Sequence, residues 1–114
     1  MAPDLDPATL AGLRDRLTTR RAELTRLIDE GRRADEPVSP DKAIGRLTRQ
    51  DALQQQQMSA ELIRRHEQEL ARVQRALRAI DEGTYGLCRR CGEPIAPARL
   101  EAMPDAVVCV PCAR

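Results

Sequence analysis

The sequence predicts an all-α-dominated fold, an antiparallel helical hairpin (coiled coil) followed by a small cysteine-containing module. Three observations support this fold class. Apolar residues recur in steps of three and four along two long segments. A stretch with two prolines separates these segments, and all four cysteines lie near the end of the chain. We therefore expect the hairpin over residues 1–82, with its turn near 32–41, and the module over residues 83–114.

The first helix is expected to begin near Pro7 and to end at Gly31. Pro7 suits the first helical position, and Asp6 or Asp4 would cap the helix in front of it. Arg20 stands at a position of the apolar stripe where a leucine is missing. Glycine at position 31 is a typical signal for the end of a helix. The stripe consists of Leu10, Leu13, Leu17, Leu24 and Leu27.

The turn and the second helix follow. The segment Arg32–Pro40 holds Pro37 and Pro40 and has no apolar run, which is typical of a turn. A single helix over Asp41–Glu82, ended by Gly83, would be about 60 Å long at 1.5 Å per residue. Because neither stripe can be buried by its own helix, the two stripes are expected to face each other. The second stripe consists of Ile63, His66, Leu70, Val73, Leu77 and Ile80.

His66 is the only histidine, and it lies on the second stripe. A polar residue in a helical seam often sets the register of the two helices, and we interpret His66 in this way. Its partner across the hairpin is expected near Leu10 or Leu13. A metal-binding or catalytic role for this histidine is the alternative.

The cysteines form two Cys-x-x-Cys pairs, C-R-R-C and C-V-P-C, separated by seventeen residues. This spacing is typical of a structural zinc site, in which each pair supplies two thiolates from one tight turn. The candidate zinc ligands are therefore Cys88, Cys91, Cys109 and Cys112. Gly92 follows the first pair, where a Cβ atom is expected to crowd the sulfurs.

Two disulfides, as in a small secreted domain, are the alternative interpretation of the four cysteines. The first residues, M-A-P-D-L-D-P, lack the apolar run of a secretory signal. We therefore expect a cytoplasmic protein with reduced thiols and one structural Zn²⁺.

The module has few apolar residues for a core, and Tyr85 is the only aromatic residue of the chain. Such a small set cannot hold a fold together without help, so the zinc ion is expected to stabilise the module. The expected core residues are Leu5, Tyr85, Ile95, Leu100, Val107 and Val108.

Composition and charge exclude several classes of function. The net charge is +1, and four thiolates with one Zn²⁺ change it to −1 (+1 − 4 + 2), so sequence-specific DNA binding is not expected. No apolar run reaches the roughly 20 residues that span a bilayer. Four cysteines complete the coordination of zinc, and no nucleophile with its base is evident, so we expect no enzyme.

The stretch from Gly83 to Ala102, G-T-Y-G-L-C-R-R-C-G-E-P-I-A-P-A-R-L-E-A, together with the later V-C-V-P-C, resembles the DksA/TraR family of zinc-finger proteins. The resemblance implies that the zinc module anchors a hairpin that enters the secondary channel of bacterial RNA polymerase. The partner that the resemblance implies is therefore core RNA polymerase. The hairpin tip would then modulate transcription initiation, in this family often together with the alarmone ppGpp.

The tip is where the sequence departs from this family. The best-known tip of the family carries D-x-x-D-x-A, and the nearest match here is V-S-P-D-K-A, in which Val38 replaces the first aspartate. Counting back from Cys88 without gaps instead places Gly45–Gln50 at the tip. Asp41 is our first candidate for the acting residue. The candidate partner-binding residues of the tip are Asp41, Lys42, Ala43 and Arg46.

The resemblance also bears on ppGpp. Longer members of the family continue with a C-terminal helix that helps to form the alarmone site, whereas this sequence stops at Arg114. Arg65 and Arg72 on the long helix are the candidate basic residues that remain. We expect a weak response to ppGpp, or none.

Two other functions are compatible with the sequence. A helical hairpin with a structural zinc finger could serve as an adaptor that binds a different protein. Cysteines that bind zinc can also be oxidised, which would suit a thiol-based redox sensor.

Overall fold

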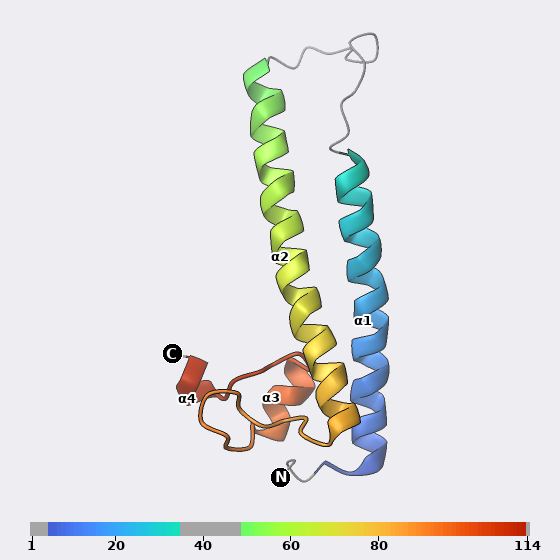
Figure 1. Ribbon diagram of the computed structural model, residues 1–114, viewed down its shortest axis with the longest axis vertical. Helices are drawn as coiled ribbons and strands as arrows, with labels where there is room; N and C mark the ends of the chain where they lie inside the picture. The colour runs from blue at the N-terminus through green and yellow to red at the C-terminus, as the bar shows by residue number, and fades with distance from the viewer. Residues whose placement is uncertain (1–4, 35–48, 114) are drawn as a thin grey trace.

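The computed structural model describes residues 5–34 and 49–113 (Figure 1). Two long helices come first, α1 (Pro7–Ala34) and α2 (Arg49–Glu82), followed by two short helices, α3 (Pro97–Ala102) and α4 (Val110–Ala113). The tip candidates Asp41, Lys42, Ala43 and Arg46, and the predicted start of the second helix, lie outside the described residues. No helix in the described part is long and apolar enough to cross a membrane.

α1 and α2 run antiparallel, and the module with α3 and α4 lies where α1 begins and α2 ends (Figure 1). The molecule measures 59 × 28 × 19 Å along its principal axes. The predicted fold class, a helical hairpin followed by a small module, is therefore confirmed. The long axis of the molecule is that of the hairpin.

The predicted seam is confirmed with one change. Leu13, Leu17 and Leu24 are buried on α1, and they face the buried Val73 and Leu77 of α2. The last position on α1 belongs to Ile28 and not to Leu27, which is only half-buried. In a straight helix, Ile28 points within about 20° of Leu17, whereas Leu27 points about 80° away.

Gly31 does not end the first helix, because α1 continues to Ala34. The glycine instead lets the two helices approach closely, since a Cβ atom added there would lie 3.0 Å from Cγ1 of Ile63. The residues Arg32–Ala34, which we expected in the turn, are therefore helical. The remainder of the predicted turn, from residue 35 on, lies outside the described residues.

The ends of the long helices follow the predicted signals. Asp6 caps α1, because its Oδ1 accepts a hydrogen bond of 2.6 Å from the backbone N–H of Thr9. Gly83 follows α2 with a φ of 78°, in the left-handed region that favours glycine. The next residue, Thr84, donates its N–H to the carbonyl of Ala79 at 2.9 Å, which closes the helix end.

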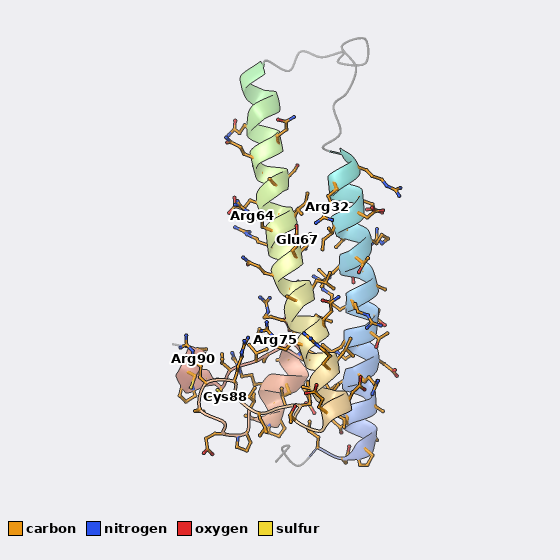
Figure 2. The ribbon with its side chains drawn as sticks, viewed as in Figure 1. Arg32, Arg64, Glu67, Arg75, Cys88 and Arg90 are labelled. Carbon is orange, nitrogen blue, oxygen red and sulfur yellow. The ribbon has the colours of Figure 1, made fainter. Side chains whose placement is uncertain are left out.

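Ion pairs across the hairpin define its register. Arg14 pairs with Asp81 at 2.7 Å at one end. At the other end Arg32 pairs with Glu67 at 3.3 Å, and Figure 2 labels these two side chains. His66 precedes Glu67 and therefore lies opposite the C-terminal part of α1. The expectation that His66 faces Leu10 or Leu13 was wrong; these leucines lie near the other end of the seam. Its role in setting the register stays a prediction.

Candidate metal centre

The structure brings all four cysteines together. Figure 2 shows one of them, Cys88, in the module at the base of the hairpin. Their sulfur atoms all lie within 4.8 Å of one another, and Sγ of Cys91 is 3.6 Å from Sγ of Cys109. A disulfide bond measures about 2.05 Å, so this contact is not a bond. All four thiols are free, which contradicts the alternative of two disulfides.

The spacing of the sulfurs fits a tetrahedral zinc ion. A Zn–S bond of about 2.3 Å places two sulfurs of a regular tetrahedron about 3.8 Å apart. Within the described residues, the metal-binding group consists of these four cysteines alone. Four soft thiolates are the ligand set that structural zinc prefers.

The first cysteine pair lies on a tight turn between Cys88 and Glu93. The N–H of Cys88 donates to the carbonyl of Glu93 at 2.8 Å, and the N–H of Gly92 donates to the carbonyl of Cys88 at 2.9 Å. Gly92 has a φ of 77°, which explains the glycine. An added Cβ atom would meet nothing within 4 Å, so the expectation that it would crowd the sulfurs was wrong.

The second pair lies at the start of α4. The N–H of Ala113 donates to the carbonyl of Cys109 at 3.0 Å, which closes the helical turn that carries Cys112. Residues three apart in a helix lie on the same side, so both sulfurs point toward the first turn. The N–H of Arg89 donates to the carbonyl of Val107 at 2.8 Å and joins the two turns.

The electrostatics of the cluster favour a bound cation. Hydrogen bonds from the backbone of the cysteine turns, that of Cys91 first, lower the pKa of Cys88 to about 6. Hydrogen bonds with the thiols of Cys109, Cys88 and Cys91, of which the first has the largest effect, raise the pKa of Cys112 to about 12. Thiols this close cannot all ionise without a compensating positive charge, and a divalent cation supplies that charge.

The module shares its core with the hairpin. Ile95 and Leu100 are fully buried, and they belong to the same apolar cluster as Leu17 and Val73. Tyr85 is also buried, and its hydroxyl donates to the carbonyl of Pro104 at 2.9 Å. The predicted core residues are therefore correct for Tyr85, Ile95 and Leu100, whereas Leu5 and Val108 pack at the edge and Val107 is half-buried.

Two arginines attach the module to the hairpin. Arg16 of α1 donates from Nη1 to the carbonyl of Glu101 at 2.7 Å. Arg72 of α2 lies with Nε 3.1 Å from Oδ2 of Asp105. Neither Arg16 nor Asp105 was predicted from the sequence, because nothing in their local sequence distinguishes them from other charged surface residues.

Both arginines that we predicted to bind the alarmone form ion pairs within the chain. Arg72 pairs with Asp105, and Arg65 pairs with Glu61 one helical turn away at 3.1 Å. The two arginines lie seven positions apart and share one face of α2.

Comparisons with known proteins agree with this geometry. The family described as "Prokaryotic dksA/traR C4-type zinc finger" matches residues 83–114. The RNA polymerase-binding transcription factor DksA of Caulobacter vibrioides is 46% identical over 41 residues, which are 36% of this chain and 29% of the relative. That of Escherichia coli K12 is 32% identical over 63 residues, 54% of this chain and 42% of the relative. The chain thus aligns with less than half the length of these relatives.

Solved structures extend the similarity to the hairpin. The structure of transcription factor DksA2 from Pseudomonas aeruginosa is 30% identical, with a TM-score of 0.70, and the match covers 95% of this chain and 82% of that one. The RNA polymerase binding protein and transcriptional regulator Dks from Chlamydia trachomatis is 26% identical, with a TM-score of 0.54 over 96% of this chain and 87% of that one. Hairpin and module are therefore arranged as in these two structures.

Proposed function

The chain belongs to the DksA/TraR family of four-cysteine zinc-finger proteins, and from this premise we propose that it binds bacterial RNA polymerase and regulates transcription initiation. The observation that carries the proposal is the match to DksA2, which spans 95% of this chain and so includes the hairpin. A zinc finger alone would fit many partners. A finger at the base of a long hairpin fits a protein that reaches into a channel.

Within this function, the zinc ion has a structural role. We propose that Cys88, Cys91, Cys109 and Cys112 are its four ligands, which leaves no open position for a reacting water. The ion would hold residues 83–114 in the shape that α1 and α2 contact through Arg16 and Arg72. We propose no enzymatic activity, and a cytoplasmic location beside the polymerase.

The hairpin of residues 1–82 would act as the inserted part. α2 has 34 residues and extends about 50 Å from the zinc module toward the tip. We propose that the tip, with Asp41, Lys42, Ala43 and Arg46, enters the secondary channel and that Asp41 acts on initiation. A carboxylate at this place would contact cationic or metal-proximal groups of the active centre.

We propose that ppGpp changes this activity weakly or not at all. A guanidinium group binds a phosphate through N–H donors, and an ion pair with a carboxylate within the chain occupies these donors. Arg72 is bonded to Asp105 and Arg65 to Glu61, so both would have to exchange an internal carboxylate for the alarmone.

The test measures binding and transcription separately. Purified core RNA polymerase should bind the zinc-loaded chain, and a ligand of the secondary channel should compete with it. Asp41→Asn should change transcription at sensitive promoters while the affinity for polymerase and the melting temperature hold. Asp29→Asn, on an exposed part of α1, is the matched control. It should change neither transcription nor the affinity for polymerase.

Two results would contradict the proposal. If the wild-type chain does not bind core polymerase, the hairpin serves another partner, as in an adaptor. If Asp41→Asn lowers stability slightly and leaves transcription unchanged, Asp41 contributes to stability alone and does not act on initiation.

A further inference from the structure

One side chain joins the two cysteine pairs. Arg90 lies between Cys88 and Cys91 in the first turn, and its backbone N–H donates to Sγ of Cys88 at 3.4 Å. Its guanidinium Nη1 donates to the carbonyl of Cys112, 22 positions away, at 3.1 Å. Arg90 therefore contacts one candidate zinc ligand from each pair. Figure 2 shows it at the outer end of the module, where α4 lies.

The second pair is held less firmly than the first. Cys88 of the first pair is buried, and it belongs to the apolar cluster that the module shares with the hairpin. Cys109 directly precedes α4 and Cys112 lies on it, and this helix has four residues and no buried side chain. Isolated helices shorter than about 12 residues are marginal in water, so α4 depends on contacts from outside itself.

Arginine side chains supply contacts at both ends of the second pair. The carbonyl of Cys112 lies in the last turn of α4, where backbone carbonyls have no partner within the helix. The guanidinium of Arg90 gives it a charge-assisted hydrogen bond, which is stronger than one between neutral groups. At the other end, Nε of Arg99 donates to the carbonyl of Val108, just before Cys109, at 3.2 Å.

Arg89 shows what is particular to Arg90. Both arginines lie between the same two cysteines and both are exposed. The backbone N–H of Arg89 donates to the carbonyl of Val107, but its side chain forms no hydrogen bond or ion pair with any described residue. The two positions thus carry the same charge beside the cysteines, and only Arg90 reaches across to the second pair.

We propose that Arg90 is a positioning residue that holds the second cysteine pair against the first and thereby slows the release of zinc. The second pair opens before the first, because α4 has few contacts of its own and the bond from Arg90 must break before Cys112 can move away. Arg90 acts through Cys112 and is not itself a ligand. The inference rests on the four zinc ligands proposed above and names what keeps two of them in place.

The rate of zinc release from the full zinc-loaded chain tests the proposal. Wild type, Arg90→Ala and Arg89→Ala are each mixed with an excess of a chelator that changes colour when it binds zinc. Arg90→Ala should release zinc about fivefold faster than the wild type, because one charge-assisted hydrogen bond is lost. Arg89→Ala, which removes the same charge from the neighbouring position, is the matched control and should stay within about twofold of the wild type.

Two further measurements follow the contact with Cys112. Arg90→Lys should restore most of the slow release, since an ammonium group can donate to the same carbonyl. Brief alkylation during release, followed by mass spectrometry, shows which cysteines become accessible. Labelling of Cys112 should rise about fivefold in Arg90→Ala, whereas labelling of Cys91, which is already exposed, should change little.

The outcomes separate this inference from the proposed ligands. If the wild type binds no zinc, both are contradicted. If it binds zinc and Arg90→Ala releases it no faster than Arg89→Ala, the ligands stand and the role of Arg90 is wrong. A lower melting temperature of Arg90→Ala without faster release would show that the residue serves only the stability of the fold. An equal rise in labelling of all four cysteines would also overturn the proposal, because the whole module would then open at once.

Discussion

Arg20 and Glu69 join the two long helices through two parallel hydrogen bonds, one of 2.6 Å from Nε to Oε2 and one of 2.9 Å from Nη2 to Oε1. Arg20 occupies the seam position where the leucine stripe is interrupted. The planar guanidinium matches the carboxylate in one geometry only, so the pair defines how α1 and α2 slide past each other. Both side chains are only partly exposed.

Removing one member of this pair should destabilise the protein. Arg20→Ala leaves the Glu69 carboxylate in the seam without its partner, and we expect a loss of about 1–2 kcal/mol, reduced by the partial exposure. Arg26→Ala, which breaks the exposed pair with Glu30, is the control and should cost less than about 0.5 kcal/mol. Urea unfolding of both variants measures the difference. Equal losses would mean that the Arg20–Glu69 pair stabilises the protein no more than the exposed pair of Arg26 and Glu30.

The pair of Arg20 and Glu69 should make the free energy of unfolding depend on pH. Hydrogen bonding to Arg20 lowers the pKa of Glu69 from its ordinary value of 4.5, so the folded state binds the proton less readily than the unfolded state. The stabilisation is present above pH 4.5 and is lost as the pH falls through the lower pKa of the folded state. The difference in unfolding free energy between the wild type and Glu69→Gln should therefore shrink in acid. A constant difference from pH 7 to pH 3 would contradict this.

The leucines of α1 and α2 differ in how deeply they are buried, and their contributions to stability should differ accordingly. Leu17 is 2% exposed, and Leu17→Ala should cost about 2–4 kcal/mol because it leaves a cavity in the core. Leu70 is half-buried, so Leu70→Ala should cost roughly half as much. Leu62→Ala is the control, because Leu62 is 52% exposed and should contribute almost nothing. Thermal unfolding ranks the three variants, and a different order would show that the seam is packed differently.

Removal of zinc should unfold the module and leave most of the hairpin helical. Cys109→Ser, or a strong chelator, is expected to release one equivalent of metal. Tyr85 reports the change, because burial raises its pKa to about 12 and exposure would return it toward the ordinary 10.0. An alkaline titration followed by tyrosinate absorbance measures this. Val110→Ser, between the second pair of cysteines and exposed, is the control that should keep the zinc.

Alanine substitutions at three glycines should separate the effect of backbone conformation on stability from the effect of packing. Gly92→Ala should cost about 1 kcal/mol through its left-handed φ alone and keep the zinc, since nothing lies near the added atom. Gly31→Ala should cost a comparable amount through contact with Ile63. Gly12→Ala, in open space within α1, should stabilise the protein by about 0.5–1 kcal/mol. Urea unfolding measures all three, and a destabilised Gly12→Ala would show that this position has a packing role after all.

The sequence predicted the features that depend on local pattern. The Asp6 cap, both stripes and the four-cysteine cluster each follow from the spacing of a few residues. It did not predict that Ile28 takes the place of Leu27, or that Gly31 serves helix contact, because both depend on how α2 lies against α1. In the sequence, Arg20 is only a gap in the stripe. Its partner Glu69 is 49 positions away, and nothing near Arg20 indicates it.

The contact between Arg16 and Glu101, 85 positions apart, has a consequence for synthesis on the ribosome. At roughly 5–20 residues per second, α1 emerges about 4–17 s before the residues that complete its packing. The covering helix α2 is completed only within this interval, and the cysteines that bind zinc emerge after both long helices. The core therefore remains open until residues 83–113 have been made, and metal capture and core closure are expected as coupled events.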